Sequence, residues 1–123
     1  MKSKTILIAD DSLVMRLKIE DELKHFENIN ILLAKDGEEA SDLLKNNEVD
    51  GMILDLLMPN VDGYGVLKIV KQLELKLPII VLTADIQPTT KQKCIDLGAK
   101  DVLHKPFNSD ELSNAVRINF NIN

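Results

Sequence analysis

Residues 5–12 of the chain read TILIADDS. Residues 5–9 form a short, almost continuous apolar run, which is typical of a strand buried on both faces. Asp10 and Asp11 follow it directly, so the run ends in two carboxylates. This also distinguishes the start of the chain from a secretory signal peptide, in which a longer apolar segment leads to small residues. The stretch therefore predicts a buried strand with acidic groups at its carboxyl end.

The same arrangement of an apolar run followed by an amphipathic stretch recurs along the chain. The predicted strands are residues 5–9, 29–34, 52–54, 79–82 and 102–104. Helices are predicted around Met15, Ile19, Leu23 and Phe26; over Gly37–Asn46; around Val66, Leu67, Val70 and Leu73; from Pro88 to Gly98; and after Asn108, around Leu112, Ala115 and Val116. Five strand–helix units predict an α/β fold, a doubly wound parallel sheet covered on both faces. The Asn-rich end, Asn119 to Asn123, is predicted to be a frayed tail.

Composition narrows the class of protein. A length of 123 residues predicts one domain over residues 1–123, and 45% hydrophobic residues suffice for a core. The net charge of −5 disfavours nucleic acid as a direct partner, since binding it requires a basic face. No apolar run reaches the roughly 20 residues of a membrane span. The single cysteine, Cys94, excludes an internal disulfide and favours a cytoplasmic location.

Polar residues follow four of the predicted strands. Asp10 and Asp11 follow the first strand, Asp55 the third, Thr83 the fourth and Lys105 the fifth. Sites in open parallel sheets form at the carboxyl ends of the strands, where neighbours lie about 4.8 Å apart. These five side chains are therefore expected to meet at one edge.

The expected cluster suits phosphoryl transfer. Three carboxylates repel one another, and a hard divalent cation such as Mg²⁺ offsets their charge. Asp55 is then a candidate nucleophile, because carboxylates can form aspartyl phosphates. Thr83 and Lys105 are placed to contact the phosphoryl oxygens, which need neutralisation in such reactions.

In their order along the chain, these residues resemble the receiver domain of two-component response regulators. The matching motifs are Asp10-Asp11-Ser12, Asp55-Leu56-Leu57-Met58-Pro59-Asn60-Val61-Asp62-Gly63, Thr83-Ala84 and Lys105-Pro106-Phe107. The likeness covers essentially the whole chain and is nearest to stand-alone receivers of the CheY type. It implies a flavodoxin-like (βα)5 fold with strand order 2-1-3-4-5.

The resemblance also implies roles for individual residues at the acidic edge. Asp55 matches the phosphoacceptor. Asp11 and Asp55 match direct ligands of Mg²⁺, Asp10 matches a ligand that acts through water, and the backbone carbonyl of Leu57 matches the remaining protein ligand. Thr83 matches the hydroxyl that moves to the phosphoryl group.

Around the last predicted strand the chain both matches and departs from the family. Lys105 matches the lysine that pairs with the phosphoryl group, and its bond to Pro106 is cis in the family. Val102 stands where the family usually has an aromatic residue, so the usual inward swing of a ring is in question. Leu57 cannot orient an attacking water, whereas Asp85 offers a polar group nearby.

The function implied is a phosphorylation-dependent signalling switch in a two-component or chemotaxis-type phosphorelay. A sensor histidine kinase or phosphotransfer protein would phosphorylate Asp55. The surface of residues 88–98, 102–104 and the final helix would then act on a downstream protein, and a phosphatase could reset the switch. Such a domain is not an enzyme with its own substrate; it assists its own phosphorylation and dephosphorylation.

Three other functions share parts of this pattern. A Mg²⁺-dependent phosphohydrolase of the haloacid dehalogenase type needs Asp-x-Asp after the first strand, but Ser12 occupies the second Asp position. A flavodoxin-like nucleotide binder needs a phosphate loop where two aspartates stand. A pseudo-receiver adaptor usually lacks the acceptor or the acids, and all are present here.

Overall fold

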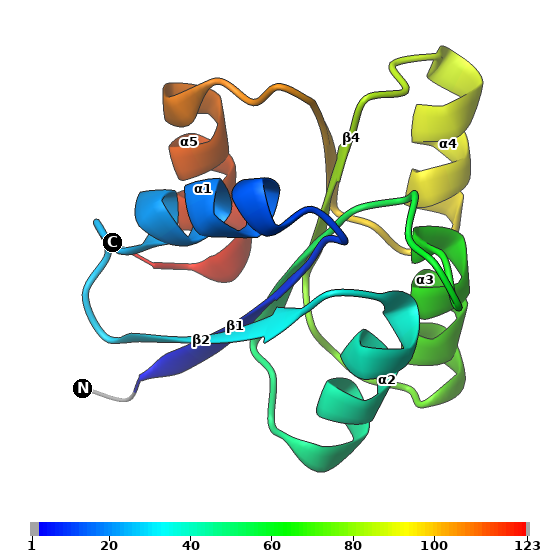
Figure 1. Cartoon of the computed structure of the whole chain (residues 1–123), viewed down its shortest axis with the longest axis horizontal. Helices are drawn as coiled ribbons and strands as arrows, with labels where there is room; N and C mark the ends of the chain where they lie inside the picture. The colour runs from blue at the N-terminus through cyan, green and yellow to red at the C-terminus, as the bar shows by residue number, and fades with distance from the viewer. Residues whose placement is uncertain (1–2, 123) are drawn as a thin grey trace.

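The computed structural model describes residues 3–122 and, over that range, contains five parallel strands and five helices in alternation (Figure 1). The strands are β1 (Lys4–Ala9), β2 (Ile29–Ala34), β3 (Gly51–Leu54), β4 (Ile79–Thr83) and β5 (Asp101–His104). The helices are α1 (Leu13–Leu23), α2 (Gly37–Asn46), α3 (Gly63–Gln72), α4 (Pro88–Asp96) and α5 (Ser109–Phe120). The predicted strand–helix alternation is confirmed. Within this range no helix combines the length and apolar character needed to cross a bilayer.

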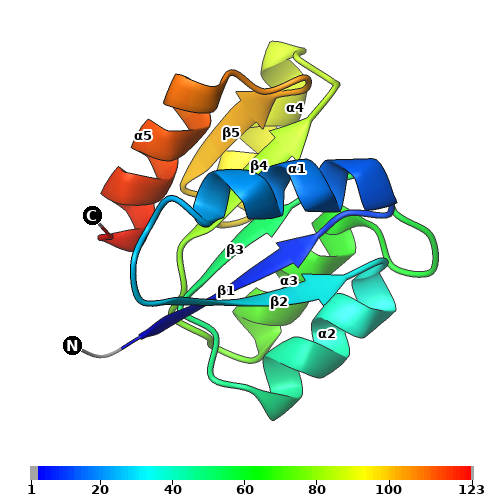
Figure 2. The same cartoon turned by 60° about the vertical axis from the view of Figure 1, so that its left-hand side comes forward.

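The strands lie in the order β2-β1-β3-β4-β5, as the resemblance implies. The first strand therefore lies between the second and third, with Ala9 in register with Ala34 on one side and Leu54 on the other. All pairs are parallel, so every carboxyl end points to the same edge (Figure 2). This order brings the residues that follow β1 and β3 side by side.

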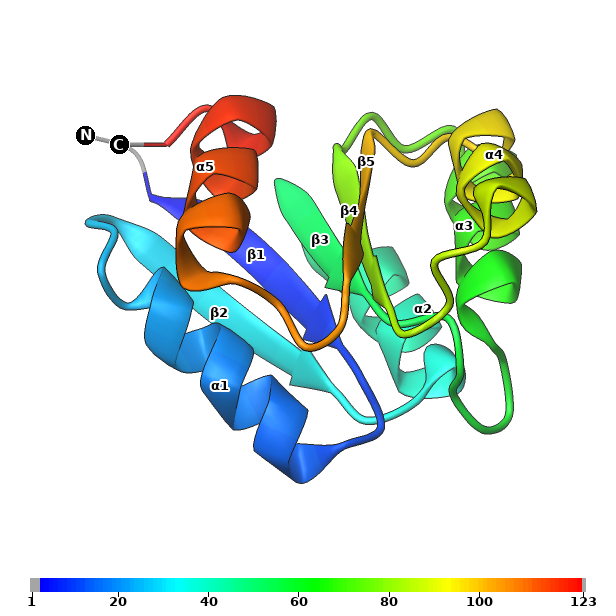
Figure 3. The same ribbon diagram turned by 90° about the horizontal axis from the view of Figure 1, so that it is seen from above.

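Each face of the sheet has its own apolar core. Successive side chains of a strand point to opposite faces, so Leu7 and Ala9 belong to one core and Ile6 and Ile8 to the other. Helices α2, α3 and α4 cover the first face, and α1 and α5 cover the second (Figure 3). The fold is the predicted doubly wound α/β sandwich.

Local signals explain where most helices begin. The side chains of Ser12, Asp36, Asp62 and Asn108 each accept a hydrogen bond from a backbone N–H in the first turn of α1, α2, α3 and α5. Helix α4 instead begins with Pro88, whose missing N–H is tolerated in the first turn.

The prediction of a frayed tail is wrong for the residues that the structure describes. Phe120 is the last residue of α5 and is only 2% exposed, and Ile122 is 8% exposed. Both join the core under α1 and α5, and the Lys4 Nζ donates to the Phe120 carbonyl at 2.7 Å. A Cβ on Gly51 would lie 2.7 Å from the Phe120 ring, so glycine leaves room for it. Asn123 lies outside the described residues.

Two apolar residues also differ from their expected positions. Helix α1 ends at Leu23, so Phe26 lies in the following turn, although it still packs partly against the core. Leu73 follows the last residue of α3 and is 42% exposed. In both cases the apolar repeat continues past the end of the helix.

Candidate functional site

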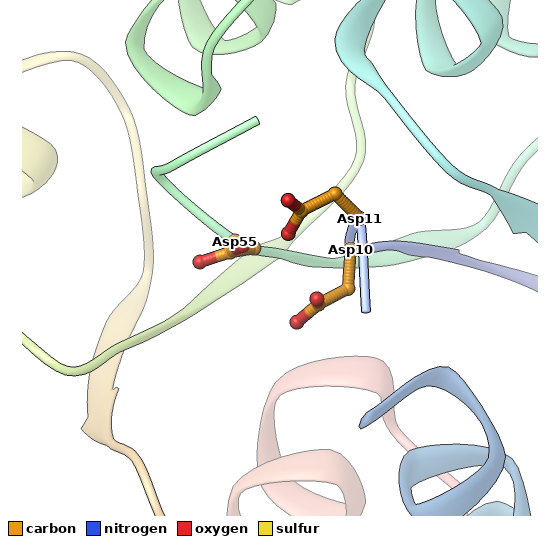
Figure 4. Close-up of side chains that lie close together, drawn as sticks. All are labelled: Asp10, Asp11 and Asp55. Carbon is orange, nitrogen blue, oxygen red and sulfur yellow. The ribbon is translucent and has the colours of Figure 1, made fainter. Parts of the chain in front are cut away.

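The residues that follow β1 and β3 form an acidic cluster at the carboxyl edge of the sheet. Carboxylate oxygens of Asp10, Asp11 and Asp55 all lie within 4.8 Å of one another (Figure 4). Asp10 and Asp55 are buried, at 1% and 7% exposure, whereas Asp11 is exposed. The predicted convergence of these three side chains is therefore present.

Backbone hydrogen bonds fix this cluster by extending the sheet one residue past its strands. The Asp55 N–H donates to the Ala9 carbonyl at 2.9 Å, and the Asp10 N–H donates to the Ala34 carbonyl at 3.1 Å. The Ser12 N–H donates to Asp10 Oδ1 at 2.9 Å. Asp10 is thus held by the strand pairing and by the residue that caps α1, and Asp55 by the strand pairing.

Lys105 directly follows the carboxyl end of β5, and its side chain extends to the acidic cluster. Its Nζ lies 2.7 Å from Asp10 Oδ2 and 3.3 Å from Asp55 Oδ1. Its backbone N–H donates to the Thr83 carbonyl at 2.8 Å, and its peptide bond to Pro106 is cis, as the resemblance implies. The lysine therefore bridges two buried acids, with the shorter contact to Asp10.

Burial and neighbouring charges shift the pKa values of Asp55 and Lys105. Burial raises the pKa of Asp55, the charge of Asp10 raises it further, and Lys105 opposes both. Burial alone would lower the pKa of Lys105, but its hydrogen bond to Asp10 and the charges of both acids outweigh that, so the pKa is raised. The raised pKa keeps Lys105 protonated, so one ammonium group faces the acidic cluster.

This donor set fits Mg²⁺. The ion prefers hard oxygen ligands at about 2.1 Å, so two oxygens on opposite sides of it are about 4.2 Å apart. The three carboxylate oxygens lie within 4.8 Å of one another, so the acids are close enough to share one cation. Leu57 lies two residues after Asp55, and its side chain is 79% exposed. Its carbonyl as a ligand stays a prediction.

Thr83 is buried at the end of β4, at 4% exposure, as expected for a strand-end residue beside the cluster. Its Oγ1 accepts a hydrogen bond from the Asp85 N–H at 3.1 Å. The hydroxyl is thus held toward the loop that follows β4. A role at the phosphoryl group requires it to turn toward Asp55.

The loop between β3 and α3, which carries Leu57, is held by contacts that the sequence did not reveal. The Asn60 Nδ2 donates to Asp36 Oδ2 at 2.9 Å, and Asn60 has a φ of 69°, which asparagine tolerates. A Cβ on Gly63 would lie 2.4 Å from the Asp55 carbonyl oxygen, so only glycine fits there. The Asp-Gly pair at 36–37 is a turn signal, but the contact from Asp36 to Asn60 is tertiary.

Arg16 is a second residue that the sequence reasoning missed. Its Nη1 donates to the backbone carbonyl of Asp10 at 2.7 Å, which ties the first turn of α1 to the end of β1. Arg16 lies four residues after the cap Ser12, about one helical turn into α1. This spacing is the sequence signal that could have identified its contact with the end of β1.

The raised pKa of Asp55 makes a prediction for the metal-free protein. A carboxyl group whose folded pKa exceeds its unfolded value stabilises the fold below the unfolded pKa, and this contribution is lost as pH rises through the folded pKa. Asp55→Asn, which is always neutral, should therefore be more stable than wild type at neutral pH, by about 1.4 kcal/mol for each unit of pKa difference. The difference in unfolding free energy between Asp55→Asn and wild type should decrease toward low pH.

Urea denaturation in EDTA across a pH series measures this difference. Adding Mg²⁺ should narrow the gap, because the ion binds the ionised wild-type cluster. A difference in unfolding free energy that does not vary with pH would mean that Asp55 titrates normally.

Comparison with known proteins defines the class of this fold and site. Residues 6–117 match the family model of the response regulator receiver domain. The chain therefore belongs to the receiver-domain family of response regulators, whose members are regulatory phosphoacceptor domains of two-component systems that bind Mg²⁺ at an acidic pocket. The predicted resemblance is confirmed, and the hydrolase and nucleotide-binder alternatives lose their support.

Individual relatives agree with this assignment. The chain is 39% identical to the response regulator MprA of Mycobacterium sp. (strain KMS) over 87% of its own length and 46% of the relative's. It is 39% identical to the transcriptional regulatory protein CpxR of Escherichia coli (strain K12), over 94% of its own length and 48% of the relative's. The chain thus spans about half the length of these relatives.

Solved structures share the fold over nearly the full chain. The receiver domain of the Francisella response regulator 1452 has a TM-score of 0.89 and 32% identity, covering 97% of this chain and 98% of that one. CheY in a CheX-CheY-BeF3-Mg complex from Borrelia burgdorferi has a TM-score of 0.89 and 28% identity, covering 95% and 89%. The CheY-like fold is therefore shown.

Proposed function

We propose that this chain is a phosphorylation switch in which Asp55 accepts a phosphoryl group, with Mg²⁺ bound, from a histidine kinase or phosphotransfer protein. One observation supports this most directly: Asp55 is buried beside Asp10 and Asp11, with Lys105 Nζ at 3.3 Å. The proposed acceptor thus has beside it two further acids that could help hold a cation and one positive side chain.

The chain's own residues account for the transfer. An Asp55 carboxylate oxygen attacks phosphorus as the bond to the donor imidazole breaks and its electron pair returns to the ring nitrogen. Asp11, Asp55 and the Leu57 carbonyl, with Asp10 through water, would hold Mg²⁺, which would supply positive charge against the phosphoryl oxygens. Lys105 can shift from Asp55 to a phosphoryl oxygen, because its pairing with Asp55 is the longer of its two contacts. The Thr83 hydroxyl donates to another oxygen.

The partners follow from the same role. A donor protein would have to approach Asp55 closely, and α1, which begins two residues after Asp11, exposes 60%, 61% and 48% of Leu13, Val14 and Leu17. Leu57, two residues after Asp55, exposes 79% of its surface. Exposed aliphatic side chains beside a reactive group suit a protein donor more than a small molecule. A downstream protein would bind the surface of α4, β5 and α5, a phosphatase would reset the switch, and the cytoplasm is the expected location.

Transfer from a protein donor tests this function. A phosphorylated cognate kinase should transfer its phosphoryl group to the wild type, and Leu17→Glu should slow that transfer about tenfold or more, as for loss of an interface anchor. Transfer from acetyl phosphate should be unchanged, because Leu17 does not line the acidic cluster.

Leu73→Glu is the matched control, since it places the same charge on a half-exposed leucine at the end of α3. It should behave as wild type with both donors. If no histidine kinase of the host transfers to the wild type, the kinase-dependent function is wrong; equal slowing with both donors would instead refute the docking role of Leu17.

A further inference from the structure

The loop between β4 and α4 is joined to the switch hydroxyl through one residue. The Asp85 N–H donates to Thr83 Oγ1 at 3.1 Å. The bond spans only two residues, so a movement of the hydroxyl away from the loop must either break it or pull the Asp85 peptide along.

The side chain of the same residue holds the start of α4. Asp85 Oδ1 accepts from the Gln87 N–H at 3.0 Å, and Oδ2 accepts from the Thr90 hydroxyl at 2.7 Å. Gln87, at the N-cap position, makes no side-chain cap bond of its own. Asp85, two residues before the N-cap position Gln87, therefore caps the start of α4. These bonds also lower the pKa of Asp85, with the Thr90 bond as the main cause.

Thr90 gives this contact a fixed anchor. It is only 8% exposed, although Asp85 and the loop residues around it are exposed. A hydrogen bond from a buried hydroxyl to a carboxylate is stronger than a hydrogen bond between two neutral groups at the surface. The loop is thus tied to the body of α4 at a single polar point.

The loop has space to move when that tie is broken. A cavity of about 130 Å³ lies between it and β5, lined by Thr83, Asp85, Ile86, Val102 and His104, among others. Ile86, the next residue of the loop, is 69% exposed, and Val102 of β5 lines the same cavity. An exposed apolar side chain beside an unfilled cavity can gain burial by moving into it.

We propose that Asp85 is a positioning residue that latches the β4–α4 loop in its resting position and must release Thr90 when Thr83 turns toward phosphorylated Asp55. This proposal rests on the proposed phosphorylation function and specifies its regulation. Asp85 makes both hydrogen bonds. Thr83 therefore cannot pull the Asp85 peptide without straining the bond between Asp85 Oδ2 and the Thr90 hydroxyl. Ile86 then enters the cavity over Val102, which explains how a switch without an aromatic ring transmits movement to α4 and β5.

Thr90→Val tests the latch, because valine keeps the shape of threonine and removes only the hydroxyl. Thr90 touches none of the site residues, so any change in binding there must come through linkage. Titrating beryllofluoride with Mg²⁺, followed by amide chemical shifts, should show affinity about three- to tenfold higher in Thr90→Val than in wild type. Thr90→Ser, which keeps the hydroxyl, should match wild type, and Asp85→Asn should shift in the same direction as Thr90→Val by a smaller factor.

Hydrogen exchange gives an independent readout. In wild type, saturating beryllofluoride should speed exchange of the Gln87 amide, whose bond to Asp85 Oδ1 a merely structural role for Asp85 would leave intact. Equal affinity in wild type and Thr90→Val, or lower affinity in Thr90→Val, would overturn the latch. Failure of the wild type itself to bind beryllofluoride would instead overturn the proposed phosphorylation function.

Discussion

Asp55→Asn is expected to abolish phosphorylation, so that incubation with acetyl phosphate and Mg²⁺ adds no phosphoryl group to the intact mass. An amide is not a nucleophile toward phosphorus, whereas its size and shape match those of the carboxylate. Asp55 is the acid of the cluster best placed to react, since Asp10 is engaged by Lys105 at 2.7 Å and Asp11 lies in the exposed part of the site. The wild type should gain one group.

Asp42→Asn is the control, because it removes an exposed aspartate of α2 that lies outside the cluster. It should be phosphorylated to the same yield as wild type. Amide spectra should show that both variants are folded. Full phosphorylation of Asp55→Asn would refute the assignment, and an unphosphorylated wild type would favour the pseudo-receiver alternative.

Asp11→Ala is expected to weaken Mg²⁺ binding by at least tenfold, measured by calorimetric titration of the metal-free protein. The variant removes the carboxylate proposed as a direct ligand, one of the three acidic groups whose oxygens lie within 4.8 Å of one another. Asp10→Asn should have a smaller effect, because Asp10 is proposed to act through water and already pairs with Lys105 at 2.7 Å. Removing the Asp11 charge should also stabilise the metal-free fold, since it relieves repulsion within the cluster.

Asp42→Ala serves as the matched control for charge, and its affinity should equal that of wild type. Unchanged affinity in Asp11→Ala would mean that Mg²⁺ does not bind at the Asp10–Asp11–Asp55 cluster. A loss in Asp42→Ala as large as in Asp11→Ala would point to bulk charge instead of ligation.

The main site could be predicted from the sequence because a parallel sheet simplifies the geometry. Once the apolar runs are read as strands, the residues after them must share one edge, and Asp10, Asp55 and Thr83 occupy that edge. The alternation of strands and helices predicted the doubly wound sheet, and the family resemblance supplied the strand order that places Asp10 beside Asp55. Neither step depends on side-chain conformation, which sequence patterns do not determine.

Contacts between loops lay beyond this reasoning. The sequence places Lys105 near the cluster but does not show that Asp10 is its closer partner. The hydrogen bond from Thr90 to Asp85 depends on how the loop before α4 turns. The tail was misread because its asparagines outnumber its apolar residues, although the burial of Phe120 and Ile122 determines its structure.

The contact between Lys4 and the end of α5 has a practical consequence for engineering. Lys4 Nζ lies 2.7 Å from the Phe120 carbonyl and 3.3 Å from that of Asn121, so the two described ends of the chain adjoin at the amino edge of the sheet. The acidic cluster at which phosphorylation is proposed lies at the carboxyl edge. A fluorescent protein or surface tether attached at either end would therefore stand clear of an incoming kinase, and a short peptide joining the ends should permit circular permutation without rebuilding the switch.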